Sequence, residues 1–159
     1  MEENVGSYMK REMVTVRSDD SIVELERALA HHRISGVPVV DDGALVGVVS
    51  RGDLVRQLAV EEALAEIATD YYRDPGLPMG EDAELGAISG EQLHSKKVAD
   101  LMTTRLITVE SSAPMADASR LMLEHGIHRV PVVDDGRLVG ILSSHDVLRM
   151  VAQTAIATD

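Results

Sequence analysis

The sequence lacks cysteine, phenylalanine and tryptophan, and its 159 residues include only three tyrosines. Without cysteine the chain cannot form a disulfide, a thiolate nucleophile or a cysteine-ligated zinc site, and this composition suits a reducing compartment. With so few aromatic rings it offers no stacking platform of the kind that single-stranded nucleic acid needs. A base bound by this chain would therefore have to lie between aliphatic side chains.

Positive charge is also scarce, since 15 basic residues face 27 acidic ones and the net charge is −12. Nucleic-acid binding relies on clustered lysine and arginine, so we expect no nucleic-acid partner. No apolar run approaches the roughly 20 residues of a membrane span, and the chain opens on acidic residues where a secretory signal would be basic and then apolar. We therefore expect a cytoplasmic protein that does not enter a membrane.

One stretch of the chain occurs twice. Val37-Pro38-Val39-Val40-Asp41-Asp42-Gly43 returns as residues 130–136, a displacement of 93 residues, and each copy leads into a second apolar run that ends in Ser-x-x-Asp. Residues 5–56 align with residues 98–149 without a gap, and about twenty positions are identical. The duplication predicts two similar halves.

Each half reads as strand, helix, strand, strand and helix, which predicts an α+β fold. In the first half we expect a helical turn near residues 5–9, a strand at 14–16, a helix at 21–32, a hairpin through 37–49 and a helix at 52–68. Ser21-x-x-Glu24 has the form of a capping box, so we place the cap of the first long helix at residues 19–21. The Asp-Gly pair between the hairpin strands suits a turn with positive φ angles. In the second half the corresponding segments are 98–102, 106–109, 114–124, 130–143 and 146–155.

The two halves are joined by a segment of different composition. Between residues 57 and 92 nine acids face one base, so this stretch carries about two thirds of the net negative charge. We therefore divide the chain into a first repeat at 5–68, an acidic linker at 69–97 and a second repeat at 98–157. The linker is either a solvated connector or a loop that binds a partner or senses a ligand.

The repeated Ser-x-x-Asp, at Ser50 to Asp53 and at Ser143 to Asp146, stands where an apolar strand passes into a helix. Serine followed three residues later by an acid is a helix-capping pattern that needs no ligand. The same position also suits a phosphate, because a helix N-terminus presents unpaired amides and the positive end of the helix dipole. The aspartate could then accept hydrogen bonds from ribose hydroxyls, and the sequence leaves both interpretations open.

The order, spacing and duplication of these elements resemble the cystathionine-β-synthase (CBS) domain, in the tandem arrangement called a Bateman module. The resemblance covers nearly all of the chain except the acidic linker. It implies two β-α-β-β-α repeats packed sheet to sheet with pseudo-two-fold symmetry and two clefts between them. It also implies a regulatory module that binds AMP, ADP or ATP and acts on a partner protein, and that often forms a homodimer.

The resemblance further implies that each cleft combines the Ser-x-x-Asp of one repeat with the first strand and the residues before the Pro-Val strand of the other. One cleft would contain Ser50, Asp53, Ile107, Thr108, His128 and Arg129. The other would contain Ser143, Asp146, Val14, Thr15, Ser35 and Gly36, with His145 beside its motif. Arg129 offers a guanidinium fork suited to phosphate oxygens where Gly36 offers none, so the Asp53 cleft is expected to bind the phosphorylated ligand more tightly.

Other interpretations remain. S-adenosylmethionine or a cyclic dinucleotide could replace the adenine nucleotide, Mg²⁺ could accompany ATP, or the module could serve only to dimerise. We expect no enzyme, because no motif gathers a nucleophile, a base and its orienting group. We also expect no metal site, because His32 and His125 stand at helix ends, where imidazole suits the last carbonyls.

Overall fold

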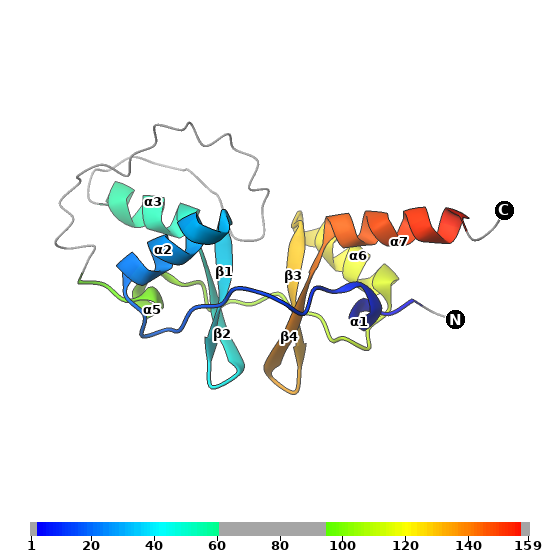
Figure 1. Cartoon of the computed structure of the whole chain (residues 1–159), viewed down its shortest axis with the longest axis horizontal. Coiled ribbons are helices and arrows are strands. Elements are labelled where there is room, and N and C mark those ends of the chain that lie inside the picture. The colour runs from blue at the N-terminus through cyan, green and yellow to red at the C-terminus, as the bar shows by residue number, and fades with distance from the viewer. Residues whose placement is uncertain (1–2, 61–94, 157–159) are drawn as a thin grey trace. The chain divides into compact units, whose positions relative to one another are not determined.

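The computed structural model describes residues 3–60 and 95–156, and it confirms the predicted order of helices and hairpins (Figure 1). The first half contains α1 (Val5–Tyr8), α2 (Ile22–His32), β1 (Gly36–Asp41), β2 (Ala44–Ser50) and α3 (Arg51–Val60). The second half contains α5 (Val98–Leu101), α6 (Met115–His125), β3 (Arg129–Asp134), β4 (Arg137–Ser143) and α7 (Ser144–Ile156). The predicted end of the first repeat, residues 61–68, and most of the predicted linker 69–97 lie outside the described residues.

The helix that follows residue 20 begins where its capping sequence predicts. The Ser21 hydroxyl accepts a hydrogen bond from the Glu24 N–H at 3.2 Å, and the Glu24 carboxylate accepts one from the Ser21 N–H at 2.8 Å. This reciprocal capping box satisfies two amides at the start of α2. In the second repeat Pro114 is the N-cap residue of α6 rather than the first helical residue, and no side chain caps that helix.

Both hairpins turn through two residues with positive φ, as the Asp-Gly pairs predict. The φ angles are 51° at Asp42 and 84° at Gly43, and they are 50° at Asp135 and 78° at Gly136. Two consecutive positive φ angles define a type I′ turn, whose twist matches that of the antiparallel strands it joins. In the second repeat β3 and β4 pair from Arg129↔Ser143 to Asp134↔Arg137, with a register irregularity between Val132 and Val133.

The predicted first strand of each repeat is wrong as a strand, because residues 14–16 and 106–109 each contribute only one isolated parallel bridge. Val16 exchanges two backbone hydrogen bonds with the residues on either side of Val39, at 3.1 and 2.8 Å. The ladder cannot extend towards the N-terminus because Pro38 has no N–H to donate. It does not extend further along the chain because the Ser18 N–H donates to the Asp41 carboxylate instead, at 3.1 Å.

Val109 pairs with Val132 in the same way, and the same two features limit its ladder. Pro131 lacks an N–H, and the Ser111 N–H donates to the Asp134 carboxylate at 2.9 Å. The hydroxyls of Ser18 and Ser111 also donate to these carboxylates, each at 2.6 Å. The serine hydroxyl first and its backbone N–H second lower the pKa of both Asp41 and Asp134.

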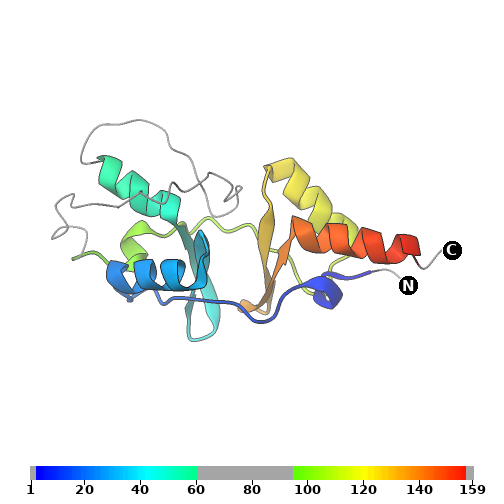
Figure 2. The ribbon, with the colours of Figure 1, turned by 45° about the horizontal axis from the view of Figure 1, so that its top comes forward.

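The chain forms two compact units that exchange their N-terminal segments. Unit 1 combines residues 1–13 and 43–45 with residues 107–159, and unit 2 combines residues 14–42 with 46–106. The first helical turn, α1, therefore lies with α6 and α7, and α5 lies with α2, as both ribbon views show (Figures 1 and 2). The short helix that opens each sequence repeat thus packs on the other repeat.

In unit 1 the N-terminal segment is held by backbone hydrogen bonds and by burial. Val5 donates to Ala113 at 2.9 Å, and Lys10 and Ile141 exchange two bonds of 2.9 Å each. Val5 is fully buried and Met9 is 8% exposed. Gly140 makes room for the segment, because a Cβ there would lie 2.6 Å from the Met9 sulfur. The close approach explains a glycine at this point of β4.

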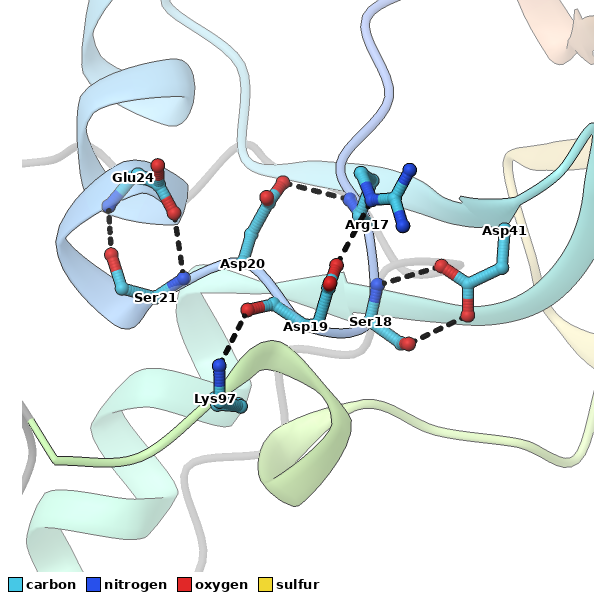
Figure 3. A network of polar contacts seen from close by, with 8 residues as sticks. All are labelled: Arg17, Ser18, Asp19, Asp20, Ser21, Glu24, Asp41 and Lys97. Atoms are coloured by element: carbon cyan, nitrogen blue, oxygen red, sulfur yellow. Dashed lines mark hydrogen bonds and ion pairs between the residues drawn. The ribbon is translucent and has the colours of Figure 1, made fainter.

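In unit 2 a network of hydrogen bonds connects the start of α5 with the loop before α2 (Figure 3). The Lys97 ammonium donates to the Asp19 carbonyl at 3.0 Å, and the Val98 N–H donates to the Asp20 carbonyl at 3.0 Å. The Asp19 carboxylate pairs with Arg17, which lowers the pKa of Asp19. Val98 itself is fully buried and belongs to the core around α2 and the first hairpin.

Candidate functional site

The first Ser-x-x-Asp joins the end of β2 to the start of α3. The Asp53 Oδ2 atom accepts hydrogen bonds from the Ser50 N–H at 2.8 Å and from the Ser50 hydroxyl at 3.0 Å. The Ser50 hydroxyl in turn accepts from the Asp53 N–H at 3.3 Å. Ser50 is 3% exposed and Asp53 is 8% exposed. The capping interpretation of the motif is therefore correct, and the cap also fixes a buried carboxylate in the first turn of α3.

The second copy repeats this geometry between β4 and α7. The Asp146 Oδ2 atom accepts from the Ser143 N–H at 2.9 Å and from the Ser143 hydroxyl at 2.6 Å, and the Asp146 N–H donates to that hydroxyl at 3.4 Å. Asp146 has no exposed surface. Burying an ionised carboxylate is costly unless it is paired, so both aspartates need a counter-ion.

Arginine supplies that counter-ion in both repeats. Arg56 contacts the Asp53 Oδ1 atom, and Arg149 contacts the Asp146 Oδ1 atom at 2.9 Å. Each arginine stands three residues after its aspartate, and its side chain is 41% or 43% exposed. These arginines were not among the predicted site residues, although both fall at equivalent positions of the repeat. The full repeated motif is therefore Ser-x-x-Asp-x-x-Arg.

The residues before each Pro-Val strand lie beside the motif of their own repeat. The Arg51 N–H donates to the Ser35 carbonyl at 2.8 Å, and the Ser144 N–H donates to the His128 carbonyl at 2.8 Å. Gly36 is buried, whereas His128 is exposed. These bonds join Ser35 to the start of α3 and His128 to the start of α7, next to the motif of each repeat.

The remaining predicted site residues lie at the two bridges and in α7. Val14 and Ile107 are half-buried, and Thr15 and Thr108 are exposed. His145 is exposed in the first turn of α7. Val14 and Thr15 belong to unit 2, together with the Asp53 motif, and Ile107 and Thr108 belong to unit 1, together with the Asp146 motif. The combination of each motif with residues of the other repeat stays a prediction.

The histidines and acids do not assemble a metal centre in the part of the chain that the structure describes. Within residues 3–60 and 95–156 there is no group of three or more histidine, cysteine or acidic side chains able to hold an ion. His31 and His32 end α2 and their rings meet edge to face, with centroids 4.8 Å apart. His125 occupies the last turn of α6.

A pair of α+β units, each with a hairpin that leads into a helix with a capped and buried aspartate, is the arrangement of a duplicated CBS domain. Residues 5–60 and 98–153 each match the family model of the CBS domain, so the chain belongs to the CBS domain family and carries a tandem pair. This identifies the family that the motifs of the sequence resemble. No helix in the described ranges is long and apolar enough to span a membrane.

Among its relatives is CBSX2, a chloroplastic CBS domain-containing protein of Arabidopsis thaliana. The two sequences are 33% identical over an alignment of 159 positions, which covers 98% of this chain and 66% of CBSX2. The crystal structure of CBSX2 in complex with AMP has a TM-score of 0.69 and 31% identity, and it covers 96% of this chain and 98% of the solved one.

A second solved structure is the CBS domain pair of protein MJ0100 in complex with 5′-methylthioadenosine and S-adenosyl-L-methionine. It has a TM-score of 0.66 and 26% identity, and it covers 97% of this chain and 99% of the solved one. The ligands of both structures are adenosine derivatives. AMP carries a phosphate, whereas 5′-methylthioadenosine and S-adenosyl-L-methionine carry a sulfur substituent.

Proposed function

We propose that this chain is a regulatory module that binds an adenine nucleotide, AMP, ADP or ATP, and passes its presence to a partner protein. The observation that carries the proposal is the duplicated aspartate, which is buried, ionic and fixed by a cap before any ligand arrives. A preorganised acceptor of this kind loses little entropy when it binds a ribose diol. The AMP complex of CBSX2 supports the choice of ligand.

In the proposed complex, different groups of the site would bind different parts of the nucleotide. The Oδ1 atoms of Asp53 and Asp146 accept from ribose hydroxyls. The first turn of α3 or α7 faces the phosphate with backbone amides. The adenine lies against aliphatic side chains, since the chain has no phenylalanine or tryptophan to stack on it. The half-buried side chains of Val14 and Ile107 suit that role.

The two sites are expected to differ in affinity for phosphate. Following the resemblance, the Asp53 motif combines with Ile107, Thr108, His128 and Arg129, and the Asp146 motif combines with Val14, Thr15, Ser35 and Gly36. Only the set around Asp53 would receive an arginine, Arg129, from the other repeat. Mg²⁺ would accompany ATP, whose triphosphate carries more charge than one guanidinium neutralises.

Calorimetric titration with AMP and with ATP, with and without Mg²⁺, tests this ranking. Asp53→Asn and Asp146→Asn keep the size of the side chain and remove its charge. We expect Asp53→Asn to weaken AMP binding by about tenfold or more, because a hydrogen bond to a charged acceptor contributes ~1.5–3 kcal/mol. A smaller loss is expected from Asp146→Asn. Equal losses, or the reverse order, would overturn the ranking.

Two alternative functions belong to the same test. One is a module that binds S-adenosylmethionine, which is present in the complex of MJ0100, or a cyclic dinucleotide. The other is a purely structural module, in which both Ser-x-x-Asp sequences serve only as caps. Adding these ligands to the nucleotide panel separates the three functions, because a structural module responds to none of them. Turnover of any added ligand would instead reveal an enzyme, which we do not expect.

The module is further proposed to act in the cytoplasm as a homodimer. Helices α6 and α7 of unit 1 present large apolar side chains to solvent, with Leu123 83%, Leu148 67% and Val151 54% exposed. Leu148 and Val151 stand three residues apart on α7, so they share one helix face, and exposed apolar side chains on one face suit a protein interface. Sedimentation of wild type and of Leu148→Glu tests the dimer. A monomeric wild type, or a variant that stays dimeric, would contradict it.

A further inference from the structure

We propose that Arg149 is a positioning residue that couples a ligand at Asp146 to the docking of the N-terminal segment, residues 3–10. The inference rests on the proposed function, since it concerns the ribose of the nucleotide. It begins from the acceptor capacity of the Asp146 carboxylate. A carboxylate offers about four lone-pair positions, two on each oxygen.

Three of those positions are already occupied by hydrogen bonds from described residues. The Oδ2 atom accepts both the N–H and the hydroxyl of Ser143, at 2.9 and 2.6 Å. The Oδ1 atom accepts the Arg149 Nη2 group at 2.9 Å. A ribose diol brings two O–H donors and finds at most one position left. Binding both hydroxyls therefore requires Arg149 to withdraw from Oδ1.

The same nitrogen of Arg149 has a second acceptor. Its Nη2 group donates to the Tyr8 carbonyl at 3.0 Å, so its two hydrogens are divided between Asp146 and the end of α1. Tyr8 is the last residue of that helical turn, where a carbonyl oxygen receives no hydrogen bond from an N–H of the same helix. Withdrawal of the guanidinium from Asp146 thus also removes a charged donor from the backbone of the N-terminal segment.

Apart from Arg149, the backbone hydrogen bonds that join the described part of this segment to the rest of unit 1 lie near its two ends. Val5 and Gly6 donate to Ala113 and Ser111 at 2.9 and 2.8 Å, and Lys10 pairs with Ile141 of β4. Arg149 contacts the stretch between these points and ties it to α7. A ligand that breaks this tie loosens the segment, and by linkage the docked segment opposes the ligand.

Hydrogen–deuterium exchange of residues 3–13 tests the coupling in the full chain. Without nucleotide, Arg149→Gln is expected to speed exchange of this segment about tenfold, since it loses a hydrogen bond from a charged group. Arg56→Gln is the matched control, because it breaks the equivalent ion pair of the first repeat and leaves Tyr8 untouched. Exchange unchanged by Arg149→Gln, or changed equally by Arg56→Gln, would overturn the anchoring.

Saturating AMP provides the second arm, with binding measured by calorimetry on the same samples. In wild type, AMP is expected to speed exchange of residues 3–13. In Arg149→Gln, exchange is already fast and AMP adds no further increase. AMP that binds without changing the segment in wild type would overturn the coupling and leave the proposed function intact. If calorimetry detects no binding of AMP, the proposed function and the coupling are both overturned. The exchange measured without nucleotide still decides whether Arg149 anchors the segment.

Discussion

Replacing Gly140 with alanine places a methyl group against the N-terminal segment. The added Cβ would lie 2.6 Å from the Met9 sulfur and 2.9 Å from the Lys10 carbonyl oxygen. The sulfur is on a flexible side chain and can move, whereas the carbonyl belongs to the backbone and accepts a 2.9 Å hydrogen bond from Ile141. The segment must therefore shift away from β4 or the strand must bend.

The expected loss of stability follows from these contacts. Overpacking a close contact typically costs ~1–3 kcal/mol, and each backbone hydrogen bond that is strained contributes a net ~0.5–1.5 kcal/mol. We expect Gly140→Ala to lower the free energy of unfolding by about 2 kcal/mol in urea denaturation. Shortening the side chain with Met9→Ala removes the nearer of the two contacts. In that background the cost of Gly140→Ala should fall by about 1 kcal/mol.

Gly47 provides the matched control. It is the equivalent glycine of β2, and its added Cβ would meet the Met102 sulfur at 2.7 Å and the Thr103 carbonyl at 3.1 Å. Met9→Ala should therefore reduce the cost of Gly140→Ala and leave that of Gly47→Ala unchanged. The assignment of the N-terminal segment to the second repeat would be refuted if Gly140→Ala cost the same in both backgrounds, or if Met9→Ala rescued Gly47→Ala.

Two further predictions concern the serine–aspartate pairs. The pKa of Asp41 is lowered from its ordinary 3.8 by Ser18, so its stabilising contribution is complete above pH 3.8 and is lost as the pH falls through the folded value. Ser18→Ala should therefore differ from wild type most at neutral pH, and a difference that persists undiminished in strong acid would contradict the assignment. Ser143→Ala should cost about 2 kcal/mol in urea denaturation, because it removes a helix cap and a donor to a buried carboxylate. Ser143→Thr should restore most of this loss, and a threonine variant as unstable as the alanine variant would argue against the cap.

Local patterns in the sequence were sufficient for the helices and hairpins. Ser21 with Glu24 predicted the start of α2, and Asp42-Gly43 predicted the turn between β1 and β2, because capping and turn chemistry act over three or four residues. The predicted strand at residues 14–16 failed for a longer-range reason. Its ladder depends on Pro38, which offers no N–H, and on a side-chain acceptor at Asp41, 23 residues from Ser18.

The exchange of N-terminal segments could not be read from the repeat. An alignment of residues 5–56 with 98–149 shows that α1 and α5 are equivalent, and it carries no information on which hairpin each one packs against. The motif residues Ser50, Asp53, Ser143 and Asp146 were found because they are repeated. Arg56 and Arg149 are repeated equally well, but their role depends on the burial of the aspartates, which periodicity alone does not reveal.

Thermal unfolding with AMP tests most directly whether the two buried aspartates hold an adenine nucleotide. Ligand at a hundredfold excess over its dissociation constant stabilises the folded state by about 2.7 kcal/mol for each site. AMP is expected to raise the unfolding temperature of wild type, and the double variant Asp53→Asn and Asp146→Asn is expected to lose this rise. No rise in wild type, or the same rise in a folded double variant, would contradict it.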